Sequence, residues 1–497
     1  GDIIAEIANY PENGNWAPHL HFQIMLSTLN YKIDFPGVCY YNQIEIWKDL
    51  CPNPNLLFKS LALNYTNDKS DDELIKYRKK HLGKSLKLHY EEPINIVRGE
   101  GVYLISKNGR KYLDTINNVA HVGHENESVV IEGQNQMSIL NTNSRYLHKS
   151  INELAEEIIQ TLPKKLNVIH FVNSGSEANE LAIRMMKSHT GSNDIIVSEN
   201  GYHGNTNICV DISSYKFDGK GGKGAPENTH VIPMPTKFNG KHKGENASKG
   251  YISEIENSIN NLKSKNRGLG GFIIEPIISC GGQVELPDGF LKTAYDLIRK
   301  NGGICISDEV QVGCGRLGES FWGFELHDVI PDIITIGKPL GNGHPIGAVV
   351  CTSEIAESFA NGMEFFNTFG GNPVSCSIAT QVLKVVKSEN LQKNAKTIGD
   401  YFKKELKKLS DKYDIIGDVR GQGLFLGIEF VDHKMNPLFK ETKYIINRLK
   451  NFGILASLDG PNNNVIKIKP PLIFSKDNCD MFIFYLHKIL EEDFLNK

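Results

Sequence analysis

Short, nearly uninterrupted apolar runs set the strongest limit on what this chain can fold into. They cover residues 169–172, 195–197, 272–274 and 304–306, and Gly or Asn stands close to their ends. Runs of this length are typical of strands buried on both faces of a parallel sheet. Helical patterns lie between them, for example over 176–188 and 289–300, and Gly302-Gly303 ends the second. The sequence therefore predicts an α/β fold around a mostly parallel sheet.

The rest of the chain predicts further segments around that sheet. A typical domain has about 100–200 residues, so a chain of 497 residues has room for two or three. We expect helices within 377–410 and over 440–452, and a strand over 424–430 between them. Residues 52–73 are rich in Pro, Asn, Asp and Ser, and this composition predicts a linker.

The composition excludes several classes of protein. Hydrophobic residues make up 40% and charged residues 23%, a balance that suits a large buried core and excludes bulk disorder. The net charge of −3 gives no electrostatic reason to expect a nucleic-acid partner. No apolar stretch approaches the roughly 18 residues of a membrane span, so we expect no membrane association. Nine dispersed cysteines without a C-x-x-C pair favour reduced thiols and a cytoplasmic location.

Three segments at predicted strand ends carry residues suited to chemistry. Asn173-Ser174-Gly175-Ser176 opens a predicted helix, where free backbone N–H groups and the helix dipole can bind a phosphate. Asp308 ends a buried strand, and a buried carboxylate needs a partner such as a protonated heterocycle nitrogen. Lys338 follows another strand among Gly and Pro, where a lowered pKa would let it form a Schiff base.

Each of these segments also has a structural interpretation. Ser174 can simply cap a helix, Asp308 can cap the next loop, and Lys338 can be a solvated surface group. The order of the three favours chemistry, because ligands of open α/β sheets collect at the carboxyl ends of the strands.

With this trio on one chain, the sequence resembles the class III aminotransferases, fold-type I enzymes that use pyridoxal phosphate (PLP). The resemblance covers about residues 74–497 and favours the branch of phospho-lyases that act on ethanolamine phosphate and 5-phosphohydroxylysine. The stretches that carry it include 117–124, 141–148, 173–179, 279–283, 337–345 and 366–371.

The resemblance also implies roles for individual residues. Lys338 is the Schiff-base lysine, and Asp308 pairs with the pyridine nitrogen of PLP. Gly175 and Ser176 hold the PLP phosphate, and Tyr202, next to His203 in the cofactor-binding segment 201–204, stacks on the ring. Val310 packs on the other ring face, and Gln311 lies near the phenolic oxygen. Thr368 completes the phosphate site of a partner subunit, which implies a homodimer. Tyr202 as core filler and Thr368 as a loop cap remain alternatives.

Lys467 bears on the substrate. Many class III members place an arginine in an Ile-Arg-Phe-x-Pro-Pro pattern to hold a substrate carboxylate, and this chain has Ile466-Lys467-Ile468-Lys469-Pro470-Pro471. Lysine is a point charge without the planar fork of arginine, so the site is poorly suited to an α-carboxylate. Lys467 and Lys469 would instead supply positive charge to a leaving phosphate; the alternative is two solvated lysines at a strand edge.

Residues 1–60 differ from the rest of the chain. Asn13-Gly14-Asn15-Trp16-Ala17-Pro18-His19-Leu20-His21-Phe22 resembles the end of a lysostaphin-type zinc peptidase domain, with His19 and His21 on one strand face. Two histidines do not complete a tetrahedral zinc site, so we expect no metal here. The first residues resemble the middle of a strand, which predicts that the chain is a piece of a longer protein.

Together these observations predict a large PLP-binding domain over 131–380 and a smaller α+β domain from 61–130 and 381–497, after the remnant at 1–60. The favoured activity is a PLP-dependent phospho-lyase that releases phosphate and ammonia from a phosphorylated amine or amino acid. The first alternative is a class III aminotransferase that uses a 2-oxo acid. The second is a PLP-type scaffold without activity, which the intact trio disfavours.

Overall fold

The structure is a computed structural model that describes residues 69–495, in two compact units that divide after Leu88. The first unit contributes helix α3 (Asp71–His81), which begins with a reciprocal capping box between Ser70 and Glu73. The predicted linker over 52–73 is therefore wrong at its end, because residues 71–73 are helical. The peptidase-like segment with His19 and His21 lies outside the described residues.

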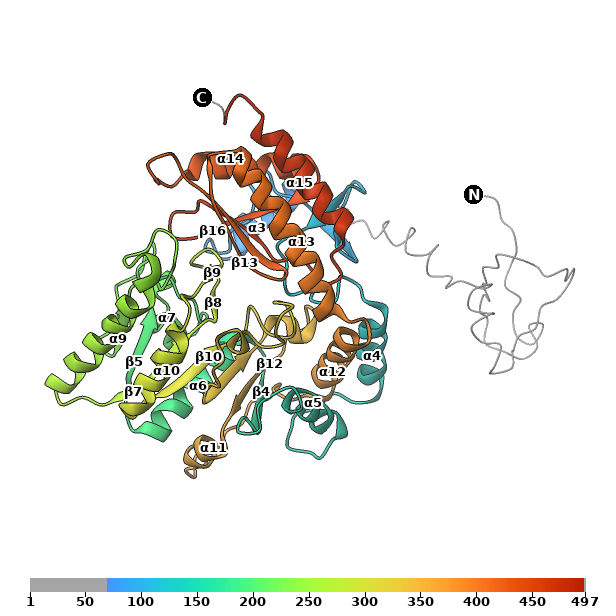
Figure 1. Cartoon of the computed structure of the whole chain (residues 1–497). Helices are drawn as coiled ribbons and strands as arrows, with labels where there is room; N and C mark the ends of the chain where they lie inside the picture. The colour runs from blue at the N-terminus through green and yellow to red at the C-terminus, as the bar shows by residue number, and fades with distance from the viewer. Residues whose placement is uncertain (1–68, 496–497) are drawn as a thin grey trace, which may run out of the picture. The chain divides into compact units, whose positions relative to one another are not determined.

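A seven-stranded sheet forms the centre of the second unit (Figure 1). All four apolar runs are strands in it, as predicted. Its order is β4 (Val168–Val172), β12 (Gly347–Cys351), β11 (Ile333–Ile336), β10 (Ile304–Asp308), β7 (Leu269–Ile274), β5 (Asp194–Ser198) and β6 (Thr229–Ile232). Strand β12 is antiparallel to both neighbours, and the other pairs are parallel. The carboxyl ends of β4, β10 and β11 therefore lie at one edge of the sheet, beside the start of β12.

Side chains of this sheet enter separate cores on its two faces, because successive residues of a strand point in opposite directions. Phe272 and Ile274 of β7 pack in one core, and Ile273 between them packs in the other. The helices of this part are α4 (Glu127–Ile139), α5 (Lys149–Ile159), α6 (Gly175–Thr190), α7 (Asn207–Asp211), α8 (Ser214–Phe217), α9 (Ala247–Ser264), α10 (Phe290–Lys300), α11 (Ser353–Phe359) and α12 (Pro373–Ser388).

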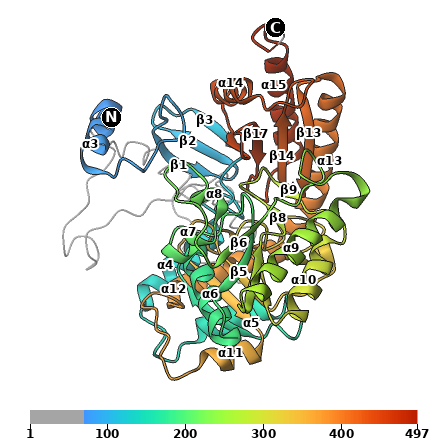
Figure 2. The same cartoon turned by 90° about the vertical axis from the view of Figure 1, so that its left-hand side faces the viewer.

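The segments before and after the large sheet build two smaller sheets (Figure 2). One combines β1 (Ile96–Glu100), β2 (Tyr103–Ser106), β3 (Lys111–Asp114) and β15 (Ile454–Leu455). The other has the order β13 (Ile416–Gln422), β14 (Phe425–Phe430), β17 (Val465–Ile468) and β16 (Ser457–Asp459). Helices α13 (Leu391–Lys412), α14 (Phe439–Asn451) and α15 (Lys476–Leu490) pack with these strands, and β8 (Ile277–Ile278) and β9 (Val284–Glu285) form a short hairpin.

This arrangement confirms the predicted fold class: a large, mostly parallel sheet accompanied by α+β structure from both ends of the chain. The predicted helices over 176–188, 289–300 and 440–452 and the strand over 424–430 are present, and the region 377–410 holds parts of two helices. The numerical domain boundaries stay predictions. Among residues 69–495, no helix combines the length and apolar character that crossing a membrane requires.

Candidate active site

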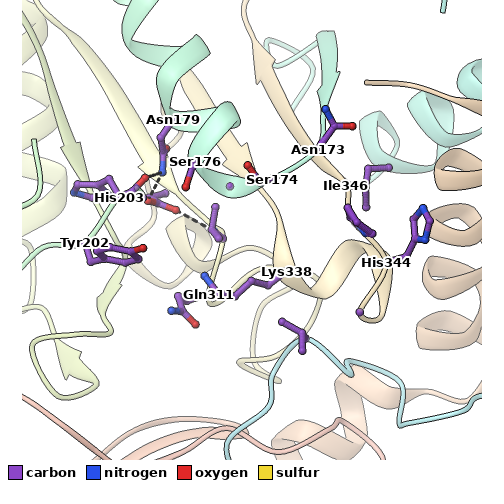
Figure 3. A pocket seen from close by; sticks show the side chains of 17 residues that line it. Asn173, Ser174, Ser176, Asn179, Tyr202, His203, Gln311, Lys338, His344 and Ile346 are labelled. Carbon is purple, nitrogen blue, oxygen red and sulfur yellow. Dashed lines mark hydrogen bonds and ion pairs between the residues drawn. The ribbon is translucent and has the colours of Figure 1, made fainter. Parts of the chain in front are cut away.

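A cavity of about 310 Å³ opens at the sheet edge where β4, β10 and β11 end (Figure 3). Gly175, Asp308 and Lys338, which come from the three predicted segments, all line it. The loop 343–346 before β12 and Val119 complete the wall. The topology thus brings together the residues that sequence order alone suggested, from positions far apart in the chain.

The first wall is the amino end of α6. Ser174 is its N-cap and accepts the backbone N–H of Glu177, as the structural interpretation of this residue predicted. The backbone N–H groups of Gly175 and Ser176 precede the first helical hydrogen bond, so the helix itself does not use them. They line the cavity, where the positive end of the helix dipole also favours an anion.

Three close contacts explain why glycines stand here. A Cβ on Gly175 would lie 2.7 Å from Cγ1 of Val310, and a Cβ on Gly337 would lie 3.2 Å from the Cα of Gly175. Gly204 has a φ of +132°, and a Cβ on it would lie 2.6 Å from Oγ of Ser176. The three segments can approach one another only because these positions carry no side chain.

Asp308 is held by three donors at the end of β10. Its Oδ2 accepts hydrogen bonds from His203 Nδ1 and Asn179 Nδ2, both at 2.8 Å, and Oδ1 accepts the N–H of Val310 at 3.1 Å. The carboxyl is only 2% exposed, so its charge depends on these partners and on whatever occupies the cavity. Oδ1, with a single protein donor, retains the capacity to accept one more hydrogen bond.

Lys338 is the first residue of a short 3₁₀ turn (Lys338–Gly341) that follows β11, and its side chain points into the cavity (Figure 3). Burial lowers the pKa of its ammonium, against the opposing effect of the Asp308 and Glu275 carboxylates. This is the direction that makes a lysine a nucleophile and a base. Glu275 is also buried, and burial together with the Asp308 charge raises its pKa to about 7.

The predicted ring-contacting residues also line the cavity. Tyr202, Val310 and Gln311 lie around Lys338, and His203 sits against Asp308 rather than in the open centre. Burial raises the pKa of the Tyr202 hydroxyl to about 12, so this side chain is a neutral aromatic surface. The lysine, the carboxylate and the aromatic ring thus surround one space.

Two predicted residues lie outside this cavity. Thr368 is exposed on a loop that Asn367 ties to the start of α6 through hydrogen bonds with Glu177 and Asn173. Lys467 on β17 forms an ion pair with Asp459, with 3.2 Å between Nζ and Oδ2. Burial pulls the pKa of Lys467 down, but Asp459 and other nearby groups outweigh it and raise the pKa above its usual value.

The structure adds site residues that sequence reasoning had not assigned. Asn179 lies one helical turn after Gly175 and Ser176 on α6, and this spacing could have placed it on the cavity face. Asn118 had no assigned role either. It contacts the side chain of Gln311 together with Lys469, which was expected beside a leaving phosphate, and no sequence signal predicts this contact.

Comparison with known proteins identifies the family. Residues 87–490 match the family model for class-III aminotransferases. This chain belongs to the class III aminotransferase family. A Drosophila melanogaster protein named alanine–glyoxylate aminotransferase 2-like is 44% identical over 442 residues, which are 87% of this chain and 90% of that protein. A Caenorhabditis elegans ethanolamine-phosphate phospho-lyase homolog is 38% identical over 440 residues, covering 85% of this chain and 94% of the relative.

A solved structure adds a comparison in three dimensions. The chain superimposes on a phospholyase from Arthrobacter in complex with phosphoethanolamine with a TM-score of 0.81 at 35% identity, covering 84% of this chain and 99% of the other. The protein is therefore a fold-type I enzyme of the class III family, and its cofactor is PLP.

The cavity residues fit this cofactor. The amino end of α6 offers N–H groups to a phosphate, and the glycine contacts leave room for one against the backbone. Asp308 Oδ1 can accept a ring N–H, and Lys338 supplies an amine of lowered pKa. The donor set thus offers an anion site, an acceptor and an amine within one cavity of suitable size.

Proposed function

We propose that this enzyme is a phospho-lyase that eliminates phosphate and ammonia from a phosphorylated amine or amino acid. The observation that carries the proposal is Lys467, which stands where many family members hold a carboxylate with arginine, with Lys469 two residues further on. Similarity to a phospholyase that binds phosphoethanolamine, at 35% identity, supports it.

The roles we assign to the site residues follow from their contacts. Gly175 and Ser176 bind the cofactor phosphate, Tyr202 and Val310 enclose its ring, and Gln311 lies beside its phenolic oxygen. Asp308 accepts a hydrogen bond from a protonated ring nitrogen, while His203 and Asn179 hold its carboxylate in that orientation.

The bound cofactor supplies an electron sink for negative charge that develops next to the substrate nitrogen. Lys338 then acts as the base that removes a proton from the carbon bonded to that nitrogen. The C–O bond to phosphate on the adjacent carbon breaks as the electron pair moves, and phosphate leaves. One water then hydrolyses the remaining nitrogen-bearing fragment to an aldehyde and ammonia.

The class III aminotransferase reaction is the alternative, and it differs at one proton transfer. In that reaction Lys338 would return the proton to a different atom, and the amino group would pass to a 2-oxo acid. The similarity to alanine–glyoxylate aminotransferase 2-like proteins supports this second candidate. The two reactions can therefore be distinguished experimentally, because only the aminotransferase requires a 2-oxo acid.

Product analysis tests the proposal. The enzyme, loaded with PLP, is incubated with phosphoethanolamine or 5-phosphohydroxylysine and no 2-oxo acid, and phosphate and ammonia are assayed together. We expect equal amounts of the two products. Turnover that starts only when a 2-oxo acid is added, with the amino group recovered on that acid, would establish the aminotransferase.

Variants at Lys467 test the substrate contact. Replacing Lys467 with Ala removes a cation, whereas Lys467→Arg retains one, so we expect the alanine variant to raise the apparent KM for the phosphorylated amine further. A raised KM at fixed kcat would assign Lys467 to binding. Equal KM values in both variants and the wild type would show that the lysine is only a strand-edge charge.

We also propose that the active unit is a homodimer. Large exposed apolar side chains gather in three segments, at residues 130–140, 146–147 and 363–369. Arg145 stacks on Phe366 at 3.9 Å, so two of these segments adjoin. Apolar surface of this extent is typical of an interface, and Thr368 lies within it. Sedimentation that found an active monomer with full cofactor occupancy would contradict the dimer.

For its compartment we propose the cytoplasm. The seven cysteines of the described region are all free thiols, which suits a reducing environment. Two relatives from Arabidopsis thaliana and Homo sapiens are named as mitochondrial, so fractionation of cells that express the native protein is the test.

A further inference from the structure

The side-chain amide of Gln311 is held from behind by two donors. Asn118 Nδ2 lies 2.7 Å from Gln311 Oε1, and Lys469 Nζ lies 3.3 Å from the same oxygen. Asn118 Nδ2 also lies 3.5 Å from the backbone oxygen of Gln311, so this NH₂ group faces Gln311 as a donor and the side-chain atom it contacts is the oxygen. Both donors come from segments outside the predicted trio.

The consequence for the cavity is chemical. With Oε1 occupied by Asn118 and Lys469, the Nε2 group is the part of the amide left for a ligand, and Gln311 lines the cavity beside Lys338 (Figure 3). Gln311 therefore presents a hydrogen-bond donor to the cavity rather than an acceptor. A flipped amide would reverse that polarity and leave the two donors facing an N–H group.

Lys469 is an unusual residue to find in this place. It is 8% exposed, and among residues 69–495 no carboxylate lies within ion-pair distance of its Nζ. Burial, followed by repulsion from Lys467 and Lys338, lowers its pKa to about 7, while Asp459 and Cys280 act in the opposite direction. A buried lysine held mainly by an amide oxygen is costly, which is reason to look for a role.

We propose that Lys469 and Asn118 are positioning residues that lock Gln311 with its N–H group toward the phenolic oxygen of the cofactor. This inference rests on the proposed place of Gln311 in the site. A donor at the phenolic oxygen of bound cofactor would stabilise the negative form of that oxygen and so would lower the proton affinity of the Lys338 nitrogen bonded to the cofactor. Loss of the lock therefore raises the pH at which the visible absorbance band of the bound cofactor changes.

The experiment measures that pH midpoint in the full chain loaded with PLP and without substrate. Lys469→Met and Asn118→Ala each remove one donor, and each should raise the midpoint by about 0.5–1 pH unit. Lys450→Met is the matched control, because Lys450 is also 8% exposed but contacts Glu92 instead. It should leave the midpoint unchanged.

A double-mutant cycle separates positioning from simple charge. Lys469 also carries charge, which would shift the midpoint through space even without Gln311. If Lys469 acts through the amide, its replacement should have little effect in a Gln311→Leu background. An undiminished shift in that background, or a Lys469→Met shift no larger than that of Lys450→Met, overturns the proposal. Asn118→Ala provides the same test should Lys469→Met fail to fold.

Because no substrate is present, the result does not depend on whether the enzyme is a lyase or an aminotransferase. A negative result here leaves the product analysis untouched. A failed phospho-lyase assay likewise leaves the spectroscopic prediction standing.

Discussion

Replacing Asp308 with Asn tests the centre of the site, because the change keeps the shape of the side chain and removes its charge. In the wild type, Oδ2 of Asp308 accepts hydrogen bonds from His203 and Asn179, and Oδ1 accepts one from the backbone N–H of Val310. An amide has one oxygen only, so in either orientation its NH₂ group must face at least one of these donors. The variant therefore loses a hydrogen bond as well as the charge that favours a protonated cofactor nitrogen.

The size of the expected fall in kcat follows from the loss of that charge. A hydrogen bond to a charged group contributes about 1.5–3 kcal/mol, and each 1.36 kcal/mol changes a rate tenfold. We therefore expect kcat to fall by roughly 10- to 100-fold at saturating cofactor. The assay follows product release, by whichever of the two reactions the wild type catalyses, together with cofactor absorbance.

Asp288→Asn is the matched control, because the Asp288 side chain is 94% exposed and pairs with Lys237. It should leave kcat unchanged. Turnover of Asp308→Asn within twofold of wild type, at full cofactor occupancy, would refute the reasoning, because the carboxylate would then have no part in the electron sink.

Three further substitutions test other parts of the site and its surroundings. Lys338→Ala should abolish turnover, and borohydride should no longer fix the cofactor to the chain; a label on another lysine in the wild type would remove Lys338 from the site. Gly175→Ala places a Cβ 2.7 Å from Val310 and should weaken PLP binding at least tenfold by equilibrium titration, whereas Gly268→Ala, whose nearest atoms are 3.9 Å away, should not. Asp459→Asn frees Lys467 from its ion pair and should lower the apparent KM for the phosphorylated amine, on the order of fivefold; an increase would show that Asp459 positions the lysine instead.

The sequence was most informative where local chemistry and strand order agree. Gly175, Asp308 and Lys338 each follow their own apolar run, and parallel strands bring such positions to one edge. The start of α3 had a local signal as well, because Ser70 and Glu73 have the spacing of a capping box. The polar composition around them favoured a linker instead, and that prediction is wrong for residues 71–73.

Contacts between distant segments could not be predicted in the same way. Asn118 and Gln311 are 193 positions apart, and Lys469 lies 158 positions beyond Gln311. Neither periodicity nor residue type links them, since their convergence depends on how three distant segments of the chain pack together. The Lys467–Asp459 ion pair is a similar case, because register between β16 and β17 decides it.

That ion pair changes how Lys467 on β17 and Lys469 just after it should be weighed. Lys467 is already partly neutralised by Asp459, so alone it offers an arriving phosphate less attraction than its charge suggests. Lys469 has no such carboxylate partner in the described region, and its lowered pKa means that a nearby anion would favour its charged form. A phosphate dianion gains most from such a site, since it can compete with Asp459 and draw a proton onto Lys469. A carboxylate has half that charge and no fork of donors to match its shape. The charges of these two lysines therefore support the proposed elimination of phosphate over the alternative exchange with a 2-oxo acid.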